Sequence, residues 1–308
     1  MRILVLGAGG IGGYFGGRLA AAGVDVSFLV RPRRAAQLAR DGLVVKSPLG
    51  DLALPVKTVS RDTAGTGYEA ILLSCKAYDL DDAIDTIRAA APGALIIPML
   101  NGMLHMDRLD REFGAGSVLG GVAQIGATLD PDGTVRHLTP GVGFILGERD
   151  AALRARVAAL TAELAKGGFA PNHSEAITQD MWQKFVFLCS IAAMCCLMRA
   201  GVAKIVATED GAALMLEMLE DCAAVAAGAG YPPSEGFMTN ARRMLTDPKS
   251  PNAPSMLRDL NAGSQVEAAH IVGDMLARSK ALESAGGRKS VLLRAAYAHL
   301  QVYQAARG

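Results

Sequence analysis

A lysine stands at the edge of a long apolar stretch of this 308-residue chain. Lys184 follows Trp182, the single tryptophan, by two residues, and between Phe185 and Met198 only Ser190 is polar. Burial strips water from an ammonium group and lowers its pKa unless a carboxylate opposes the loss. Such an ammonium can give its proton to an oxygen that is becoming negative, so Lys184 is a candidate general acid. The alternative is that its stem covers apolar surface while the ammonium reaches water.

A glycine-rich turn opens the chain. Residues 7–12 form a G-x-G-x-x-G motif between a strand-like run at 3–9 and a helical pattern at 11–23. Gly7 permits a tight turn, Gly9 lets a pyrophosphate approach the backbone, and Gly12 lets the helix pack against the strand. Phosphates are favoured by the free N–H groups of a helix N-terminus. The motif predicts a dinucleotide site made of Gly7, Ala8, Gly9, Gly10, Ile11 and Gly12. The alternative is that these glycines serve packing alone.

The end of the second strand discriminates between nicotinamide cofactors. An NAD enzyme usually carries Asp or Glu there to accept the ribose hydroxyls. Here the strand at 25–30 is followed by Arg31, Pro32, Arg33 and Arg34, with no acidic residue. An arginine can hold a 2′-phosphate through charge-assisted hydrogen bonds, so Arg31 predicts NADP (NADPH) as the cofactor. A solvated basic helix start is the alternative for Arg33 and Arg34.

The first part of the chain alternates strand and helix patterns, with strands at 70–75 and 94–100 around a helix at 81–91. This alternation is typical of a parallel sheet covered by helices. Short strands at 118–128, 134–138 and 144–147, separated by turn residues, predict a small antiparallel run before a helix at 151–166. Beyond about residue 172 the patterns are all helical, at 175–200, 209–229, 234–246, 255–282 and 290–306. The predicted fold is α/β: a Rossmann-type dinucleotide-binding domain at 1–170, then an all-α domain at 171–308.

Composition excludes several classes of protein. Hydrophobic residues make up 51% of the chain and the formal net charge is +1, which indicates a globular protein with no basic surface for nucleic acid. The five cysteines include no C-x-x-C pair, and no metal site is expected. The apolar run at 185–198 is shorter than the about 20 residues that cross a bilayer. Strand-like sequence follows Met1 directly and leaves no room for a signal peptide, so a cytoplasmic protein without a membrane partner is expected.

Five segments in the same order resemble the ketopantoate reductase (2-dehydropantoate 2-reductase) family. The segments are MRILVLGAGGIGGYFGGRLA at the start, SCKAYD around Lys76, LNGM around Asn101, WQKF around Lys184, and SMLRDLNAGSQVEAAHIVG from Ser255 to Gly273. The resemblance covers nearly the whole chain. It implies reduction of 2-dehydropantoate (ketopantoate) by NADPH to (R)-pantoate, a step toward pantothenate and coenzyme A.

The resemblance also implies a role for individual residues. Lys184 and Glu267 would be catalytic, Lys76 and Asn101 would join the glycine loop and Arg31 at the cofactor, and Asn101, Lys184 and Ser255 would contact the 2-oxo acid. Each has a simpler alternative: Lys76 reaching solvent from a strand end, Asn101 in an Asn-Gly turn, Ser255 as a helix N-cap, Glu267 on an exposed helix face. His270, on the same predicted helix as Glu267, is expected to be a packed or surface residue and not a catalyst.

Three positions depart from the family pattern. The family usually carries asparagines four and eight residues after the catalytic lysine, where this chain has Leu188 and Ala192, and several relatives have His where Gln124 stands. Without these amides the site loses hydrogen bonds to a polar substrate. A less polar 2-oxo acid or ketone would suit a pocket lined by Leu188, Cys189 and Ala192. Two further hypotheses are therefore a paralogous reductase and a non-catalytic NADP(H)-binding sensor. Helical second domains of this kind often pair with a second copy, so a homodimer is one expectation.

Overall fold

The computed structural model describes residues 1–307 and divides into two compact units. Unit 1 comprises Met1–Leu100 and His105–Ile177, and unit 2 comprises Asn101–Leu104 and the chain from Thr178 onward. The division thus falls after Ile177, whereas the sequence places it near residue 170. The short segment Asn101–Leu104 packs with the helical unit, although it directly follows the last strand of the parallel sheet.

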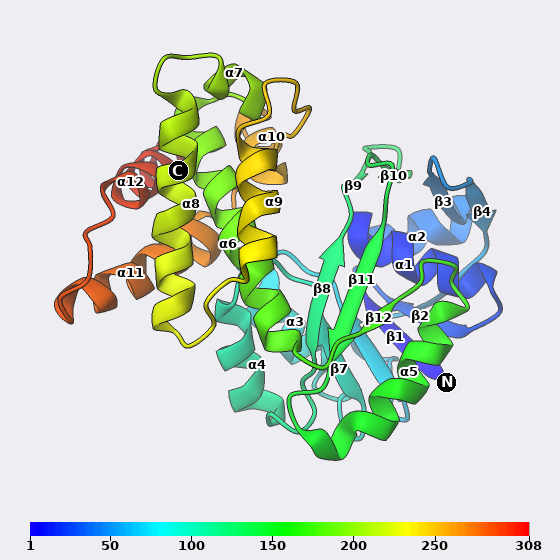
Figure 1. Ribbon diagram of the computed structural model, residues 1–308. Coiled ribbons are helices and arrows are strands. Elements are labelled where there is room, and N and C mark those ends of the chain that lie inside the picture. Colours follow the sequence, from blue (N-terminus) through cyan, green and yellow to red (C-terminus); the bar gives the residue numbers. More distant parts are fainter. Residues whose placement is uncertain (308) are drawn as a thin grey trace. The chain divides into compact units, whose positions relative to one another are not determined.

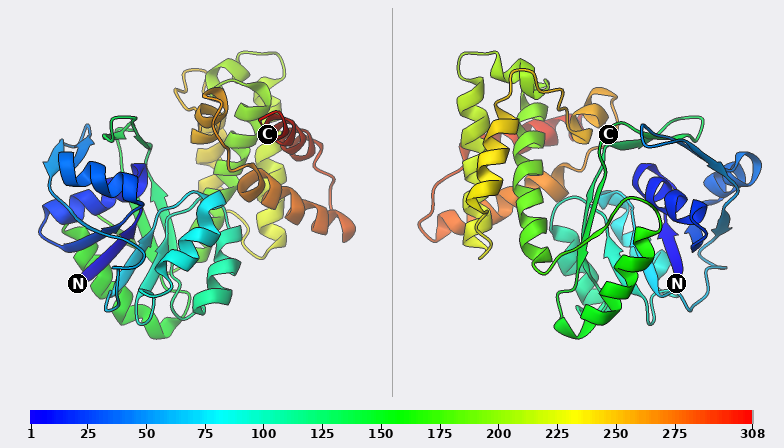
Figure 2. Two further views of the ribbon diagram at one scale, coloured as in Figure 1. Left: turned by 180° about the vertical axis from the view of Figure 1, so that it is seen from behind. Right: turned by 45° about the vertical axis from the view of Figure 1, so that its right-hand side comes forward.

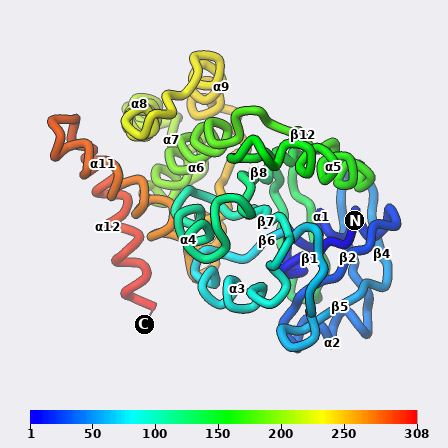
Figure 3. The backbone as a smooth tube through the Cα atoms, turned by 90° about the horizontal axis from the view of Figure 1, so that it is seen from below, coloured from blue at the N-terminus to red at the C-terminus, as the bar shows by residue number. Residues whose placement is uncertain are grey.

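Within residues 1–307 the largest sheet has five strands, all paired in parallel, in the order β5-β2-β1-β6-β7 (Figures 1 and 3). They are β5 (Lys57–Val59), β2 (Asp25–Leu29), β1 (Arg2–Leu6), β6 (Ala70–Leu73) and β7 (Leu95–Pro98). The central strands are apolar and buried, as expected of parallel strands covered by helices on both faces. With β1 at the centre and Leu6 in register with both Leu29 and Leu73, the predicted Rossmann-type fold is confirmed.

Helices make the crossovers that parallel strands require. The first, α1 (Gly10–Ala21), joins β1 to β2, and α2 (Pro32–Asp41) follows β2. The 3-10 turn η1 (Ala77–Asp79) and α3 (Leu80–Ile87) join β6 to β7. Figure 3 shows α3 on one side of the strands and α5 (Arg154–Ala165), which the 3-10 turn η2 (Ala151–Leu153) precedes, on the other. The core of unit 1 includes residues of β1, β2, β6, β7, α1 and α5.

The predicted antiparallel run is divided between two smaller sheets. One pairs β8 (Gly120–Gln124) with β11 (Gly143–Gly147) antiparallel, beside β12 (Asn172–His173); the other has the order β4-β3-β10-β9. Its strands are β3 (Leu43–Lys46), β4 (Leu52–Leu54), β9 (Ala127–Leu129) and β10 (Val135–His137). A single strand over 118–128 was therefore the wrong prediction. The chain breaks at Ile125–Gly126, where the Gly126 N–H turns to donate to Thr139 Oγ1 at 3.1 Å.

Unit 2 is helical, which confirms the predicted all-α second half. Figures 1 and 2 show α6, α8 and α9 side by side. The elements are α6 (Ile177–Met198), α7 (Val202–Val206), α8 (Gly211–Gly228), α9 (Glu235–Leu245), α10 (Ser255–Asn261), η3 (Ala269–Gly273), α11 (Asp274–Ser284) and α12 (Val291–Ala305). By length and composition α6 could span a membrane, but 67% of its most apolar window is buried inside the protein. Its apolar residues are those of a core helix. The remaining helix, α4 (Leu104–Phe113), follows the Asn101 loop.

The predicted continuous helix at 255–282 is wrong. The first helix, α10, ends at Asn261, where Gly263 adopts a φ of +67° and the Ser264 N–H donates to the Asp259 carbonyl at 2.8 Å. This is a Schellman cap, which a glycine completes without steric cost. Non-helical chain follows to Glu267, and the helix resumes with a π-helical turn, η3. Ser255 and Glu267 therefore lie on separate segments and not on one helix.

Candidate active site

The glycine loop has the geometry that its sequence predicts. Gly7 has a φ of +90°, which a side chain would disfavour. A Cβ on Gly12 would lie 2.2 Å from the Gly7 carbonyl oxygen and 2.2 Å from Ser74 Oγ, so no other residue fits there. Around Gly9 nothing lies within 4 Å of such an atom, which leaves its backbone open to a ligand. The loop combines a tight turn, close helix packing and open space beside Gly9.

Helix α1 begins at Gly10 with its N-terminus uncapped by any side chain and with no acidic residue in its first turn. A Cβ on Gly10 would lie 2.9 Å from the Ala127 backbone, so this glycine lets α1 approach β9. The partial positive charge of the helix end is therefore not neutralised by its own side chains. These features fit the pyrophosphate of a dinucleotide.

The guanidinium of Arg31 is engaged by carboxylates. Arg31 is the N-cap residue of α2, and its side chain is 70% exposed. Nη2 donates to Asp79 Oδ1 at 3.0 Å and to Asp82 Oδ2 at 3.1 Å, and these hydrogen bonds raise the pKa of Arg31. Arg61 also bonds Asp82, at 2.7 Å. A phosphate at Arg31 would compete with two carboxylates that the sequence analysis did not consider.

Arg34 is a cation without a carboxylate partner, held against the glycine loop. Its Nε donates to the Ala8 carbonyl at 3.1 Å, and Nη1 donates to Gln37 Oε1 at 2.8 Å and to the Gly133 carbonyl at 3.0 Å. Among residues 1–307 its buried Nη2 has no hydrogen-bond partner. Desolvation lowers the pKa of Arg34, and no acidic side chain opposes this shift. Sequence reasoning treated Arg34 as a solvated or weakly supported candidate, because nothing local shows that it folds back over Ala8.

Lys76 lies on the same edge of the parallel sheet as the glycine loop. It is the N-cap residue of η1, two residues after Ser74, whose Oγ donates to the Leu6 carbonyl at 2.7 Å. Lys76 is partly buried. Its backbone is fixed because its carbonyl accepts the Asp79 N–H at 2.9 Å. The backbone of Lys76 is therefore held next to the turn between β1 and α1.

Lys184 lies in the second turn of α6, between the buried residues Trp182 and Phe185. The residue keeps some exposed surface, but protein surrounds its ammonium group. Desolvation lowers the pKa of Lys184 from its ordinary 10.5 to about 8, and the charge of Glu267 partly opposes this shift. Both the ammonium and the neutral amine are therefore accessible near neutral pH, as acid–base catalysis requires.

Glu267 is buried, with 8% of its surface exposed, although the sequence left an exposed helix residue as its alternative. It stands just before η3, and its carbonyl accepts the Ile271 N–H at 3.1 Å. Its carboxylate acts electrostatically on both Lys184 and His270. The break after Asn261 lets this side chain enter the interior of unit 2.

The Asn101 loop contacts His270. Gly102 has a φ of +80°, and a Cβ there would lie 2.9 Å from the His270 carbonyl oxygen and 3.1 Å from ring atom Cδ2. The ring of His270 is hydrogen-bonded to the Asn101 backbone. His270 is buried, with 7% of its surface exposed. Sequence reasoning excluded it from the site, and the proximity of the LNGM loop could not be read from local patterns.

Ser255 is the first residue of α10, and Pro254 takes the N-cap position. The N-cap alternative therefore does not describe Ser255. Among the described residues its hydroxyl makes no hydrogen bond, and the residue is partly buried. The hydroxyl is available to a ligand.

The face of α6 that continues from Lys184 is mostly closed. Leu188, one turn on, is partly buried, whereas Ala192 and Cys189 have no exposed surface. Cys189 packs against η3, with Sγ 3.9 Å from the Ile271 carbonyl oxygen. The expectation that all three line a substrate pocket is wrong for Ala192 and Cys189, because helix packing covers them. Leu188 alone of the three retains surface for a substrate.

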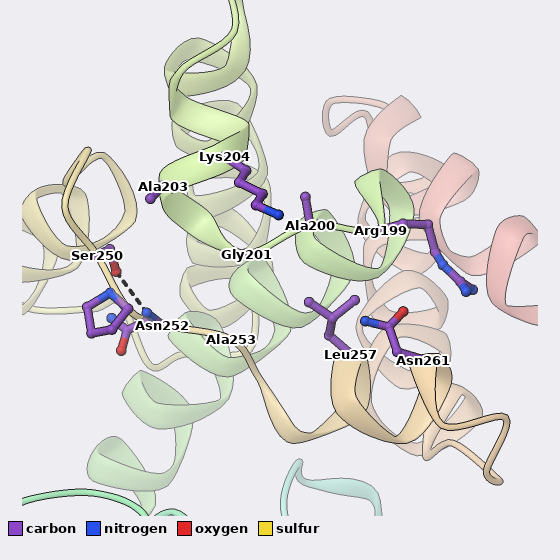
Figure 4. A pocket seen from close by; sticks show the side chains of 11 residues that line it. Arg199, Ala200, Gly201, Ala203, Lys204, Ser250, Asn252, Ala253, Leu257 and Asn261 are labelled. Atoms are coloured by element: carbon purple, nitrogen blue, oxygen red, sulfur yellow. Dashed lines mark hydrogen bonds between the residues drawn. The ribbon is translucent and has the colours of Figure 1, made fainter.

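A surface hollow of about 300 Å³ opens elsewhere in unit 2 (Figure 4). It lies around α7 and the chain leading into α10, and it is lined by Arg199, Ala200, Gly201, Ala203, Lys204, Ser250, Pro251, Asn252, Ala253, Leu257 and Asn261. None of these is a predicted site residue, and the lysine of lowered pKa lies outside it. Across residues 1–307, no three His, Cys, Asp or Glu side chains are grouped so that they could hold a metal ion.

A Rossmann-type unit with an open glycine loop, followed by a helical unit, is typical of an oxidoreductase that uses a nicotinamide dinucleotide. Comparison with known families agrees. Residues 3–150 match the family described as ketopantoate reductase PanE/ApbA, and residues 176–290 match its C-terminal counterpart. The chain belongs to the ketopantoate reductase family.

Two relatives match this chain over most of its length. The chain is 32% identical over 306 residues to the uncharacterized oxidoreductase YkpB of Bacillus subtilis, with 99% of each chain covered. It is 27% identical to a 2-dehydropantoate 2-reductase of Halobacterium salinarum over 91% of this chain and 92% of that one.

Solved structures share the fold. A ketopantoate reductase from Ralstonia eutropha superimposes with a TM-score of 0.88 at 25% identity, covering 100% of this chain and 99% of that one. A D-mandelate dehydrogenase with NADH and anilino(oxo)acetate gives a TM-score of 0.88 at 18% identity, with the same coverage. Two solved proteins with different names thus share this architecture.

Proposed function

We propose that this protein reduces the 2-oxo group of a small 2-oxo acid with NADPH, and that 2-dehydropantoate, which gives (R)-pantoate, is its first candidate substrate. The observation that carries the proposal is Lys184, an ammonium with a pKa of about 8 whose charge Glu267 supports. The 2-dehydropantoate 2-reductases among the relatives favour this substrate. The proposal places the protein in pantothenate and coenzyme A biosynthesis in the cytoplasm, with a homodimer as its expected assembly.

The residues of unit 1 fit a nicotinamide dinucleotide. Gly9 leaves open backbone, Gly12 lets α1 pack closely, and α1 presents an uncapped N-terminus. When bound, the reduced nicotinamide supplies hydride to the carbonyl carbon of the substrate. Gly7, Ala8, Gly9, Gly10, Ile11 and Gly12 would contact the pyrophosphate, and Lys76 and Asn101 would complete the cofactor site.

Lys184 would supply the proton. When the carbonyl carbon gains hydride, its oxygen becomes an alkoxide, and the ammonium stabilises this charge and then transfers a proton to the oxygen. The product is the 2-hydroxy acid, and the neutral amine recovers its proton from water. A pKa of about 8 makes Lys184 a stronger acid than a solvated lysine, yet it remains mostly protonated at neutral pH.

Glu267 would keep Lys184 charged before the reaction. Its negative charge stabilises the protonated form of Lys184, whereas desolvation destabilises that form. Ser255, whose hydroxyl bonds no described residue, and Asn101 would hold the polar groups of the substrate. These assignments give every predicted site residue of unit 2 a task.

The charge distribution at the end of β2 supports NADPH. Arg34 is desolvated against the glycine loop with no carboxylate partner, so an anionic group there would relieve its uncompensated charge. Arg31 would contribute after exchanging Asp79 or Asp82 for phosphate. We therefore propose that Arg34 and Arg31 together recognise the 2′-phosphate, with Arg34 as the stronger contact.

A second candidate substrate is a less polar 2-oxo acid. Leu188 stands one helical turn after Lys184 and keeps exposed surface, but it has no hydrogen-bonding group. A pocket that contacts Leu188 would favour an apolar substituent over the hydroxyl of 2-dehydropantoate. A D-mandelate dehydrogenase solved with NADH and anilino(oxo)acetate has the same fold, which supports testing an aromatic 2-oxo acid.

Loss of NADPH absorbance with a panel of 2-oxo acids tests the proposal. The panel contains 2-dehydropantoate, 2-oxoisovalerate and phenylglyoxylate, each assayed also with NADH. A kcat/KM of about 10⁴ M⁻¹s⁻¹ or above with 2-dehydropantoate supports the first substrate. The same value with phenylglyoxylate alone supports the second. NADPH binding without turnover of any 2-oxo acid would instead support the sensor hypothesis.

A further inference from the structure

We propose that His270 is a positioning residue that holds the backbone of Asn101 and Gly102, and through it the Asn101 amide, in the conformation that binds the 2-oxo acid. The inference deepens the proposed function and rests on the role proposed there for Asn101. It assigns a task to a residue that its sequence position left as a packed or surface histidine.

The first support is steric. Gly102 lies so close to His270 that an added Cβ would be 2.9 Å from its carbonyl oxygen, 3.1 Å from Cδ2 and 3.5 Å from Nε2. The φ of +80° at Gly102 turns the chain onto the ring. Asn101–Leu104 accordingly belongs to unit 2, although both flanking segments belong to unit 1. The loop is therefore seated on the helical unit through this contact.

The second support is a hydrogen bond. The bond between His270 and the Asn101 backbone favours the protonated ring, which means that a ring N–H donates to the Asn101 carbonyl. A buried imidazole needs such a partner. Together the bond and the Gly102 contact hold the backbone on the C-terminal side of the Asn101 Cα, which limits the directions open to its side-chain amide.

The third support is the segment that carries the ring. His270 lies in η3, and Glu267 comes three residues earlier, so one short segment supplies both the carboxylate that acts on Lys184 and the imidazole that holds Asn101. The π-helical turn ends at Gly273, where an added Cβ would be 2.9 Å from the Tyr297 ring. Close packing against α12 thus keeps η3 in place. Such turns recur at functional sites.

The charged groups around His270 determine how its protonation depends on pH. The charged groups that act on the ring are Glu267 and Asp274, and both favour protonation. Asp274 is itself bonded by Arg278, with both oxygens 3.1 Å from Nε. Desolvation is the largest effect and lowers the pKa of His270 below its ordinary 6.5. A proton gained at low pH would place a positive charge beside Glu267 and Asp274.

Three variants of the full chain test the proposal. His270→Phe keeps the ring volume but removes the donor, and His270→Gln keeps a donor that does not titrate. His299→Phe, on α12, is the matched control, because the buried His299 Nε2 makes no hydrogen bond within residues 1–307. KM and kcat are measured for the 2-oxo acid and for NADPH between pH 5 and 9, and hydrogen exchange is followed in the peptide containing residues 98–106.

We expect His270→Phe to raise KM for the 2-oxo acid about five- to tenfold, the effect of one lost hydrogen bond, with a smaller change in kcat. It should also speed exchange in the Asn101 peptide. His270→Gln should restore KM and exchange, because its amide can donate in place of the ring N–H. Equal behaviour of the Phe and Gln variants, or an unchanged KM and unchanged exchange in a folded His270→Phe protein, overturns the proposal.

The exchange measurement separates this proposal from the proposed function. If the natural protein turns over no 2-oxo acid, the proposed function fails. Faster exchange of residues 98–106 in His270→Phe, but not in His270→Gln or His299→Phe, would still support the hold on Asn101. Unchanged exchange of residues 98–106 in all three variants would overturn the proposed role of His270.

Discussion

Glu267 supplies the charge that opposes the desolvation of the Lys184 ammonium. The two residues come from segments far apart in the chain, the second turn of α6 and the segment just before η3. Without the carboxylate, burial alone would lower the pKa of Lys184 below about 8. The proposed proton donor is therefore a pair of residues, and its properties can be changed from either side.

Replacing the ammonium tests the proton donor directly. Lys184→Met keeps the length and apolar stem of the side chain but removes the acid, and we expect kcat to fall by about 10²- to 10⁴-fold. The dissociation constant for NADPH, measured by fluorescence titration, should change little. Lys280→Met, at an exposed position of α11, is the control and should retain activity. A Lys184→Met enzyme with ordinary turnover would refute the assignment.

The pH dependence follows from the lowered pKa of Lys184. Reduction needs the ammonium, so its kcat should fall as pH rises through about 8; oxidation of the hydroxy acid needs the neutral amine, so its kcat should rise through the same range. In Glu267→Gln the supporting charge is lost and both midpoints should move to lower pH. Midpoints near 10.5, the ordinary lysine value, would show that Lys184 is not the titrating group.

The same shift predicts how stability depends on pH. Because the folded pKa of Lys184 is depressed, the unfolded chain binds more protons between pH 8 and 10.5, and this group contributes a free energy of unfolding that rises with pH there. Below pH 8 Lys184 is protonated in both the folded and the unfolded chain, so the folded protein bears the full free-energy cost of burying the ammonium. Lys184→Met should lose this slope in urea titrations. If the free energy of unfolding of Lys184→Met still rose with pH as steeply, other titrating groups would be responsible for the pH dependence.

Cofactor preference should depend more on Arg34 than on Arg31. Arg34→Ala removes a cation without a carboxylate partner, so KM for NADPH should rise about 10- to 100-fold while KM for NADH changes much less. Arg31→Ala should have a smaller effect, because Asp79 and Asp82 already neutralise this guanidinium. Arg33→Ala, exposed between them, is the control. If Arg34→Ala raised KM for NADPH and for NADH equally, Arg34 would stabilise the backbone at Ala8 and would not recognise the 2′-phosphate.

Substrate choice is tested at Leu188. Leu188→Asn introduces an amide one turn after Lys184, at a position with exposed surface, and should raise kcat/KM for 2-dehydropantoate relative to an apolar 2-oxo acid by about tenfold. Ala192→Asn is the contrasting variant. Ala192 is fully buried, so its amide would be unsatisfied and should lower the melting temperature without improving selectivity. Unchanged selectivity in Leu188→Asn would place the substrate away from this face.

Local patterns in the sequence were enough for the parallel sheet, the glycine turn and the helical second half. The G-x-G-x-x-G spacing constrains backbone within a few residues, and Gly7 and Gly12 adopt the conformation and packing that the motif implies. The apolar run after Lys184 was correctly interpreted as a buried helix, since burial of so many apolar side chains is the strongest available driving force. Such features depend on neighbours in sequence.

Only the tertiary structure decided which charges face each other. In the structure α10 ends at Asn261, and Glu267 is buried where its charge acts on Lys184. Gly102 packs against His270. Arg31 bonds Asp79, and Arg34 bonds the Ala8 carbonyl. These contacts join residues that are distant in the chain, and helical periodicity carried across the Gly263 turn predicted the wrong segment for Glu267. The physical reason is that hydrophobic pattern and backbone preference act locally, whereas desolvation and pairing of a charge depend on every segment that packs around it.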